Sequence, residues 1–252
     1  MRMSYRIFEF FCKVLICMIT SIIMVEERFD SKKNQLWLEK LFDEIVSYAL
    51  PLVRDKYILD AGSGSGWSES KFVDAGAKKI DAFDIDEESV KFGNSLKLEG
   101  VTYAKKDFNE SDFGDNIYDT VISVEVIEHL TNAEYYFKNL VRALKPNGIL
   151  FLTTPNKKLS TNQNQYHVKE YTLEEMSDMF KKNNVEITEL HGISSSSGSK
   201  IAGKFIPRPI LEIVKKTFLY SILVKHFVRF PIKPNVEDAE TIVYIGKKVQ
   251  LN

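Results

Sequence analysis

The sequence contains little cysteine and carries almost no net charge, and each shortage excludes a class of protein. Its two cysteines, Cys12 and Cys17, lie close together near the first residue, so the sequence predicts neither a Cys/His zinc site nor a disulfide framework. The predicted location is therefore cytoplasmic, with the inner face of a membrane as the alternative. Lysine and arginine (34) nearly balance aspartate and glutamate (35), so bulk charge does not favour a nucleic-acid-binding protein.

The sequence also lacks an apolar run that is clearly long enough to cross a membrane. Residues 7–25 are mostly apolar, but Glu9 and Lys13 interrupt them, whereas a spanning helix needs about 20 predominantly apolar residues. We therefore predict an apolar N-terminal extension at residues 1–26, followed by one large domain at residues 27–252.

Three interpretations of this extension stay open. Residues 7–25 form an interfacial membrane anchor, or they form a helix that packs on the domain, or residues 1–23 are an upstream stretch and the native start is Met24. A signal peptide is disfavoured, because no small-residue cleavage site follows the apolar stretch.

Positive charge is concentrated in a predicted insert at about residues 198–235. Residues 200–233 contain eight Lys or Arg side chains and a single acid, Glu212. Large apolar residues recur at helical spacing within residues 205–230, which predicts a basic amphipathic helix. Such a helix can contact an anionic membrane surface peripherally, and the alternative is that it covers the domain's own core. Aliphatic residues dominate this segment, so nucleic acid is an unlikely partner.

The 252 residues, 44% of them hydrophobic, suffice for a complete core, and their pattern alternates between strands and helices. This alternation predicts an α/β fold: a doubly wound, Rossmann-like, mostly parallel seven-stranded sheet with helices on both faces. The predicted strands are residues 57–60, 80–84, 101–104, 120–124, 148–153, 185–190 and 241–247. The predicted helices are residues 36–52, 67–75, 87–98, 133–144 and 173–183.

A glycine-rich loop follows the first predicted strand, in the stretch ILDAGSGSG at residues 58–66. Glycines at this place let the backbone approach a ligand closely at the carboxyl end of the strand. The dinucleotide fingerprint G-x-G-x-x-G/A does not fit, because its sixth position is Trp67. Asp60 precedes the loop and would repel a pyrophosphate, whereas it would suit an amino group.

A second acid, Asp84, ends the next predicted strand. A carboxylate at this position accepts hydrogen bonds from the hydroxyls of a ribose. The predicted ligand therefore carries an ammonium group near Asp60 and a ribose near Asp84.

With these features the chain resembles the class I S-adenosylmethionine-dependent methyltransferases, especially the group of ubiquinone-type and glycan-associated O-methyltransferases. The matching segments are residues 58–66, Asp84, and residues 105–110, 118–130, 144–156 and 166–176. The resemblance implies that the glycine loop holds the methionine end of the cofactor S-adenosylmethionine, that Asp84 holds the ribose, and that Asp107 with Phe108 frames the adenine. The predicted cofactor-binding residues are Asp60, Gly62, Ser63, Gly64, Gly66, Asp84, Ile85, Asp107, Phe108 and Glu125.

The segment after the fourth predicted strand supplies candidate catalytic residues. Histidine is the residue type most often used as a base near neutral pH, so His129 is the first candidate for a base or an orienting group, with Glu128 beside it and His167 in a later loop. The alternative for His129 is packing beside the cofactor. A divalent metal ion on Glu125, Glu128 and His129 is a less favoured interpretation, because this pattern is also common as plain loop structure.

The acceptor is predicted as a small molecule or a lipid-linked compound, of the prenylated-quinol or glycan type, because two apolar segments flank the domain. A non-catalytic adaptor that docks a membrane or a partner through the basic insert stays open as a second hypothesis. A nicotinamide-dependent oxidoreductase is a third, and Trp67 and Asp60 argue against it.

Overall fold

The computed structural model describes residues 34–110, 112–160, 164–194, 232–233 and 235–250. The predicted extension at residues 1–26 and the predicted membrane-contact segment at residues 205–230 lie outside the described residues, as does most of the basic insert. The chain divides into two compact units, Met1–Glu44 with Ser194–Ile232 and Ile45–Ile193 with Lys233–Asn252. All predicted site residues belong to the second unit.

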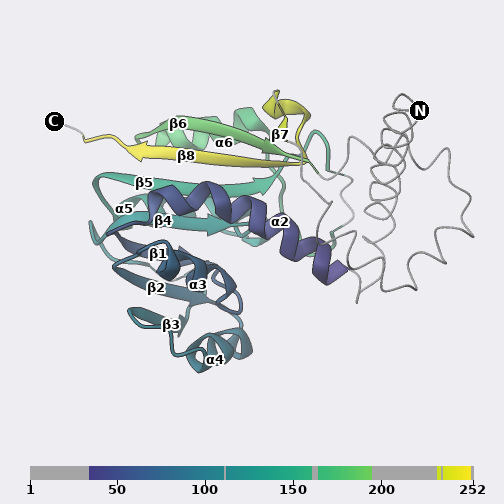
Figure 1. Cartoon of the computed structure of the whole chain (residues 1–252). Coiled ribbons are helices and arrows are strands. Elements are labelled where there is room, and N and C mark those ends of the chain that lie inside the picture. The colour runs from purple at the N-terminus through teal and green to yellow at the C-terminus, as the bar shows by residue number, and fades with distance from the viewer. Residues whose placement is uncertain (1–33, 111, 161–163, 195–231, 234, 251–252) are drawn as a thin grey trace, which may run out of the picture. The chain divides into compact units, whose positions relative to one another are not determined.

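The second unit is built on a mostly parallel sheet, as predicted (Figure 1). The order of its strands is β3-β2-β1-β4-β5-β8-β6-β7. The pairs from β3 to β5 are parallel, and β8 runs antiparallel to both β5 and β6. The strands are β1 (Tyr57–Ala61), β2 (Lys79–Asp84), β3 (Val101–Lys105), β4 (Tyr118–Val124), β5 (Leu144–Pro155), β6 (Val185–Ile193), β7 (Ile232–Lys233) and β8 (Thr241–Lys248).

All seven predicted strands are present, and the structure adds the two-residue edge strand β7. The central strands form because their apolar residues are buried on both faces of the sheet, as parallel strands require. Leu59, Val121 and Leu150 are fully buried. The reversal of strand order between β1 and β4 places the carboxyl ends of these two strands where open α/β sheets bind ligands.

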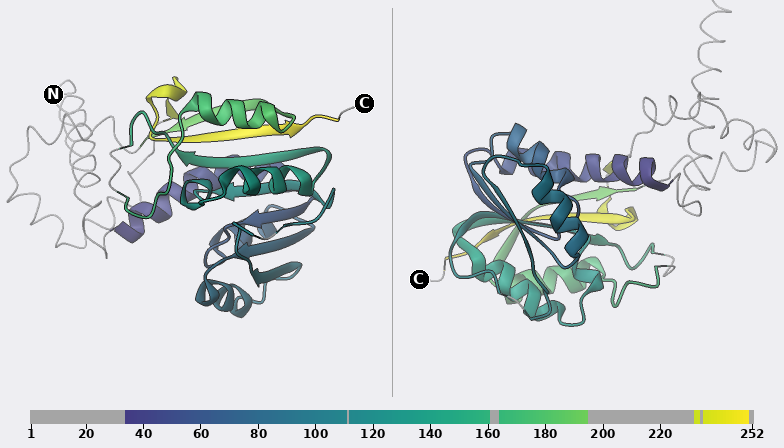
Figure 2. Two further views of the ribbon diagram at one scale, coloured as in Figure 1. Left: turned by 180° about the vertical axis from the view of Figure 1, so that it is seen from behind. Right: turned by 90° about the horizontal axis from the view of Figure 1, so that it is seen from below.

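Helices cover both faces of this sheet, and Figure 2 shows α5 and α6 on the face opposite α3. The amphipathic helices α5 and α6 bury Phe137, Leu140 and Phe180 against the sheet. A capping box begins α6, since Thr172 and Glu175 satisfy each other's backbone N–H groups. The helices are α2 (Asn34–Ala49), α3 (Trp67–Asp74), α4 (Glu87–Ser95), α5 (Ala133–Ala143) and α6 (Leu173–Lys182), with short 3-10 turns η2 (Leu50–Leu52), η3 (Ile127–His129) and η4 (Val236–Asp238).

One boundary differs clearly from the prediction. β5 begins at Leu144, directly after α5, and not at residue 148. Pro146 and Asn147 read as a turn in the sequence, and Asn147 does take a positive φ of 64°. A shift in the pairing register of β4 with β5, between Tyr118 and Thr120 of β4, accommodates this irregularity.

Within the part of the chain that the structure describes, no helix has both the length and the apolar character needed to cross a membrane.

Candidate active site

The glycine loop joins the carboxyl end of β1 to the first turn of α3, as predicted. Gly62, Gly64 and Gly66 all have positive φ angles, of 104°, 53° and 85°. These angles are strained for residues with a side chain, and glycine adopts them freely. The loop is tied to β2, since Gly62 N and Ser63 N both donate to the carbonyl of Phe83 at 2.8 and 3.0 Å.

The three glycines have different surroundings. A Cβ atom on Gly62 would overlap Cγ2 of Val126, so the glycine loop and the segment after β4 touch at this point. A Cβ on Gly66 would lie 2.7 Å from the hydroxyl of Tyr103. A Cβ on Gly64 would meet no atom within 4 Å, so the backbone of Gly64 borders open space. Gly64 is therefore the loop position that a ligand can approach most closely.

Asp84 lies beside this open position. Its Oδ2 accepts a hydrogen bond from Gly64 N at 2.8 Å, and its Oδ1 accepts one from Asp86 N at 2.9 Å. These two bonds fix the orientation of the carboxylate, and each oxygen keeps a lone pair for a further donor. The next side chain, Ile85, is 53% exposed and provides an apolar surface beside the carboxylate. Both placements fit the predicted roles of these residues.

Two acids are buried beneath the glycine loop. Asp60 was predicted from the sequence and is 3% exposed, while Glu69, in the first turn of α3, was missed and is fully buried. Burial, with a contribution from the charge of Asp84, raises the pKa of Asp60 to about 7, and burial with the charges of Asp60 and Asp84 raises the pKa of Glu69 well above its usual value. The sequence holds a weak signal for Glu69, an acid soon after a glycine loop, but the same pattern occurs wherever an acid favours a helix N-terminus.

The two residues predicted to frame the adenine differ in burial: Asp107 is exposed and Phe108 is buried. Asp107 is exposed, and its Oδ1 accepts a hydrogen bond from Asn109 N at 2.9 Å. Phe108 is 4% exposed, and its ring packs against Phe113 and Tyr136 at centroid distances of 5.7 and 5.5 Å. Phe108 therefore anchors the loop from below, and Asp107 is the member of the pair that a ligand can reach.

Glu125 follows β4 with a positive φ of 53°, a conformation that is strained for a glutamate. Its Oε1 accepts a hydrogen bond from the hydroxyl of Thr153 at 2.9 Å, while its N–H donates to Thr153 Oγ1 at 3.2 Å. Burial raises the pKa of Glu125 to about 7, and the charge of Glu170 contributes to the increase. Strained backbone of this kind is concentrated at functional sites, so the placement is consistent with the predicted contact to the cofactor.

Glu128 is fully buried at η3 and is held from two sides. Its Oε2 accepts a hydrogen bond from the hydroxyl of Thr154 at 3.0 Å, whereas its Oε1 has no partner among the described residues. Its backbone carbonyl accepts hydrogen bonds from Val168 N and Lys169 N at 2.8 and 3.1 Å. This turn therefore fixes the later loop that carries His167.

The structure brings His129 and His167 together, as neighbouring predicted catalytic residues. Their rings lie edge to face with centroids 4.9 Å apart. His129 Nδ1 is 3.0 Å from the carbonyl oxygen of Tyr166, which can only accept, so Nδ1 carries the proton and donates. The lone pair of His129 then lies on Nε2, which makes no hydrogen bond to a described residue and is 3.9 Å from Glu128 Oε1.

His167 differs from His129 because both of its ring nitrogens are engaged. Nδ1 is 2.6 Å from Oε1 of Glu170, and Nε2 is 2.8 Å from the amide Nδ2 of Asn164. The side chain of His167 is 13% exposed, and that of His129 is 38% exposed. His129 is thus the more accessible imidazole with a free nitrogen, and Glu170, which the sequence analysis missed, orients His167.

Potential metal ligands also converge here. One ligand atom each from Glu128, His129 and His167 lie within 4.8 Å of one another. The sequence analysis placed Glu125 in this set and not His167, but the carboxylate of Glu125 is directed to Thr153.

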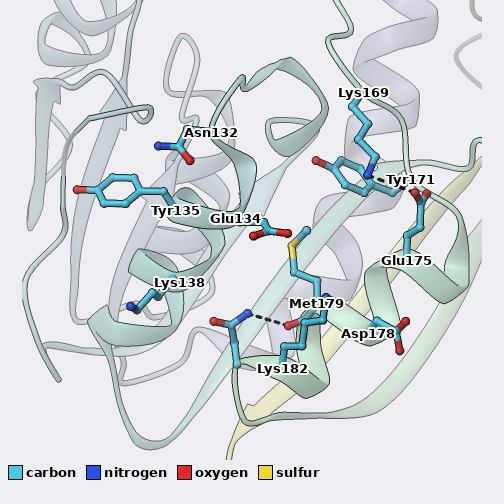
Figure 3. A pocket seen from close by; sticks show the side chains of 11 residues that line it. Asn132, Glu134, Tyr135, Lys138, Lys169, Tyr171, Glu175, Asp178, Met179 and Lys182 are labelled. Atoms are coloured by element: carbon cyan, nitrogen blue, oxygen red, sulfur yellow. Dashed lines mark hydrogen bonds and ion pairs between the residues drawn. The ribbon is translucent and has the colours of Figure 1, made fainter.

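A separate groove of about 550 Å³ lies between α5 and α6 (Figure 3). It mixes both charge signs, and Lys169 forms an ion pair of 3.2 Å with Glu175 at its edge. None of the predicted site residues lines this groove. We therefore assign it no part in the candidate site.

Four carboxyls with raised pKa values predict how stability depends on pH. The pKa values of Asp60, Glu69, Glu125 and Glu128 are all raised by burial above their ordinary values of 3.8 and 4.5, to about 7 for Asp60 and Glu125. The folded chain then binds more protons than the unfolded chain between about pH 4 and about pH 7, so the free energy of unfolding falls as pH rises through this window. We expect thermal melts of the ligand-free protein to show a lower Tm at about pH 8 than at about pH 5.5. A Tm that rises over this interval contradicts the raised pKa values of these carboxyls.

Comparison with protein families gives one match that covers most of the second unit. A family model described as "Methyltransferase domain" matches residues 32–190. The ubiquinone biosynthesis O-methyltransferase of Rickettsia akari is 26% identical over 179 residues, which cover 64% of this chain and 70% of that protein. The enzyme of the same name from Rickettsia typhi is 31% identical over 157 residues, which cover 54% of this chain and 62% of that protein.

Solved structures show the same fold at low sequence identity. An S-adenosylmethionine-dependent methyltransferase from Mesorhizobium loti has a TM-score of 0.58 and 14% identity, covering 80% of this chain and 95% of that one. The cyclase SpnF has the same TM-score, 0.58, at 15% identity, covering 83% of this chain and 81% of that one. Since proteins of different activity share this fold, the structural likeness supports the architecture and not the reaction.

Proposed function

Because this chain belongs to the family of methyltransferase domains and uses S-adenosylmethionine, we propose that it transfers the methyl group to a hydroxyl oxygen of a small-molecule or lipid-linked acceptor. The observation that carries the proposal is the free Nε2 of His129, on the segment that packs against the glycine loop through Val126. An unprotonated imidazole nitrogen in this position can take the proton of an attacking hydroxyl.

The residues around the glycine loop fit S-adenosylmethionine. Gly64 borders open space, the oriented carboxylate of Asp84 has acceptor capacity for ribose hydroxyls, and Ile85 offers an apolar surface. The buried acids Asp60 and Glu69 give the methionine end, which carries an ammonium group, a negatively charged surrounding. The bound cofactor supplies a methyl group that is already activated on a sulfonium sulfur.

The protein's own contribution is then alignment and proton transfer. The acceptor oxygen must be held behind the methyl group for an in-line displacement. A phenolic hydroxyl has an ordinary pKa of about 10, so its reaction benefits from a base that removes the proton as the new C–O bond forms. His129 takes this proton on Nε2, while its Nδ1–H bond to the carbonyl of Tyr166 fixes the ring.

We favour a catechol or quinol as the acceptor, with a prenyl chain as its lipid part. The support is the similarity to proteins named ubiquinone biosynthesis O-methyltransferases, together with the imidazole base, which suits a phenol better than an aliphatic hydroxyl. A lipid-linked sugar is the other acceptor that the sequence left open. Contact with a membrane through residues 7–25 and 205–230 is part of this proposal.

The test is a transfer assay with methyl-labelled S-adenosylmethionine and three probes: a short-chain prenylated catechol, the same catechol without the chain, and a lipid-linked sugar. We expect label on a catechol oxygen, identified by mass spectrometry of the product. Label on the sugar would instead identify the acceptor as a glycan. Label that appears only on nitrogen or carbon, or no transfer by a protein that binds the cofactor, would refute it.

A divalent ion bound by Glu128, His129 and His167 is a second candidate for activating the acceptor. The ligand atoms of these residues converge, and Glu128 Oε1 is buried without a partner among the described residues. Such an ion would polarise both oxygens of a catechol. His167 could join it only by releasing Asn164 or Glu170, which favours the metal-free base. Repeating the transfer assay with EDTA distinguishes the metal-free base from the metal ion. Activity that EDTA abolishes and Mg²⁺ restores supports the ion.

Replacing Asp84 with alanine is expected to weaken the binding of S-adenosylhomocysteine by about 100-fold or more. The variant loses two hydrogen bonds from ribose to a carboxylate, each contributing about 1.5–3 kcal/mol, and it also frees Gly64 N. Asp84→Asn keeps one acceptor oxygen and should lose less. Calorimetry measures both, and circular dichroism confirms the fold. Wild-type affinity in Asp84→Ala would remove Asp84 from the cofactor site.

A further inference from the structure

The strongest unexplained feature of the molecule is the fully buried carboxyl of Glu69. Neither of its oxygens meets a hydrogen-bond donor among the described residues, and its carboxyl lies within hydrogen-bonding reach of another acid, Asp60. A buried ionised carboxylate without a partner is strongly disfavoured, so such a group stays neutral or acts on a ligand. Glu69 lies in the first turn of α3, directly after the glycine loop.

Asp60 lies on the same face of the sheet as Tyr103, whose hydroxyl borders Gly66 in the glycine loop. In the parallel register Asp60 pairs with Ala82, and Ala82 pairs with Tyr103, so the side chains of Asp60 and Tyr103 share one face. The hydroxyls of Tyr103 and Ser63 are also buried without a partner among the described residues. An under-satisfied polar cluster therefore lies directly below the loop that approaches the cofactor.

The charges that act on this pair within the described residues come from acids. The charge of Asp84 raises the pKa of Asp60, whereas the hydrogen bond with Glu69 lowers it, and the charges of Asp60 and Asp84 both raise the pKa of Glu69. Tyr103 on β3 and Tyr136 on α5 also face the pair, and they stay neutral because burial raises their pKa values far above neutrality. None of the described groups that face the pair is a cation. Asp60 and Glu69 therefore cannot both be ionised at neutral pH while the site is empty.

We propose that Asp60 and Glu69 share one proton in the empty site and release it to solvent when the positively charged methionine end of S-adenosylmethionine or S-adenosylhomocysteine binds. Glu69 is then a positioning residue that acts through Asp60. Burial raises the pKa values of both acids, so the pair keeps a proton while the site is empty. An ammonium group placed beside the pair favours its ionised form, so binding and proton release are linked.

This inference rests on the use of the cofactor and not on the proposed acceptor, so a failed transfer assay leaves it standing. Its test is titration calorimetry of S-adenosylhomocysteine into the full chain at about pH 6.5, where the ligand's α-amino group is charged. Repeating the titration in buffers of different ionisation enthalpy gives the number of protons released. The probe for comparison is 5′-methylthioadenosine, which carries the adenosine but no amino group.

We expect wild type to release close to one proton with S-adenosylhomocysteine and close to none with 5′-methylthioadenosine. Glu69→Gln is expected to release close to none with either ligand, because the amide can donate to Asp60 and leaves it ionised beforehand. The matched control is Glu88→Gln, on α4, whose side chain is 81% exposed, and it should behave as wild type.

Proton release by Glu69→Gln equal to that of wild type would overturn the proposal, as would equal release with both ligands. If Glu69→Gln does not fold, the wild-type protein still decides the question. Its affinity for S-adenosylhomocysteine should increase by up to tenfold between about pH 5.5 and about pH 6.5, with no matching increase for 5′-methylthioadenosine. An affinity for S-adenosylhomocysteine that does not change with pH contradicts the linkage.

Discussion

Replacing His129 with glutamine is expected to lower the turnover of a catechol probe by about 100- to 10,000-fold, the range for loss of a general base. Glutamine can still donate to the carbonyl of Tyr166, but it cannot accept the proton that Nε2 takes in the proposed reaction. Binding of S-adenosylhomocysteine should stay at the wild-type level, because His129 lies on the acceptor side. Turnover is measured by product formation and binding by calorimetry.

His191→Gln is the matched control, since His191 lies on β6, where it forms an ion pair of 3.0 Å with Glu189 in its protonated form. This control should keep wild-type turnover. Near-normal turnover in His129→Gln would contradict the proposed role. An equal loss of turnover and of cofactor affinity would instead assign His129 to packing beside the cofactor, the alternative that the sequence left open.

Replacing Gly62 with alanine is expected to destabilise the fold by about 2–6 kcal/mol. The added Cβ overlaps Cγ2 of Val126, and the φ of 104° is unfavourable for any residue with a side chain. Chemical denaturation gives the free energy of unfolding. Because the overlap involves a single methyl group, Gly62→Ala combined with Val126→Ala should recover part of the loss.

Gly64→Ala is the matched comparison within the same loop. Its Cβ would meet no atom within 4 Å, so we expect a cost of only about 1–2 kcal/mol from the φ of 53°. The same Cβ would enter the open space beside Asp84, so the affinity for S-adenosylhomocysteine should fall by about tenfold or more. If Gly62→Ala is no less stable than Gly64→Ala, the contact between the glycine loop and Val126 is wrong.

The sequence sufficed to predict the sheet and the cofactor loop because both depend on local patterns. Short apolar runs with β-branched residues, bounded by Gly, Asp or Asn, became strands β1 to β4, and the glycines of the loop adopt positive φ angles. The short edge strand β7 was not predicted, because two residues give no periodicity. The start of β5 was missed because Pro146 and Asn147 resemble a turn in isolation.

Site residues could be predicted from the sequence only where a local pattern, such as an acid at the end of a strand, marks them. Asp84 follows a strand in the expected position, whereas the burial of Glu69 depends on how α3 packs on the sheet, which no sequence window contains. Glu170 was missed for a similar reason, since its contact with His167 depends on the loop docking on Glu128. Phe108 is predicted beside the adenine, and the sequence alone does not show that its ring packs into the core against Phe113 and Tyr136.

We infer that the glycine loop and Asp84 form a site for S-adenosylmethionine and not for a dinucleotide. Calorimetric titration of S-adenosylhomocysteine into the full chain, with NADH titrated in parallel, distinguishes the two ligands. We expect binding of S-adenosylhomocysteine with a Kd of about 1 μM, equivalent to about −8 kcal/mol, and no heat from NADH. A folded protein that does not bind S-adenosylhomocysteine, or that binds NADH instead, would contradict it.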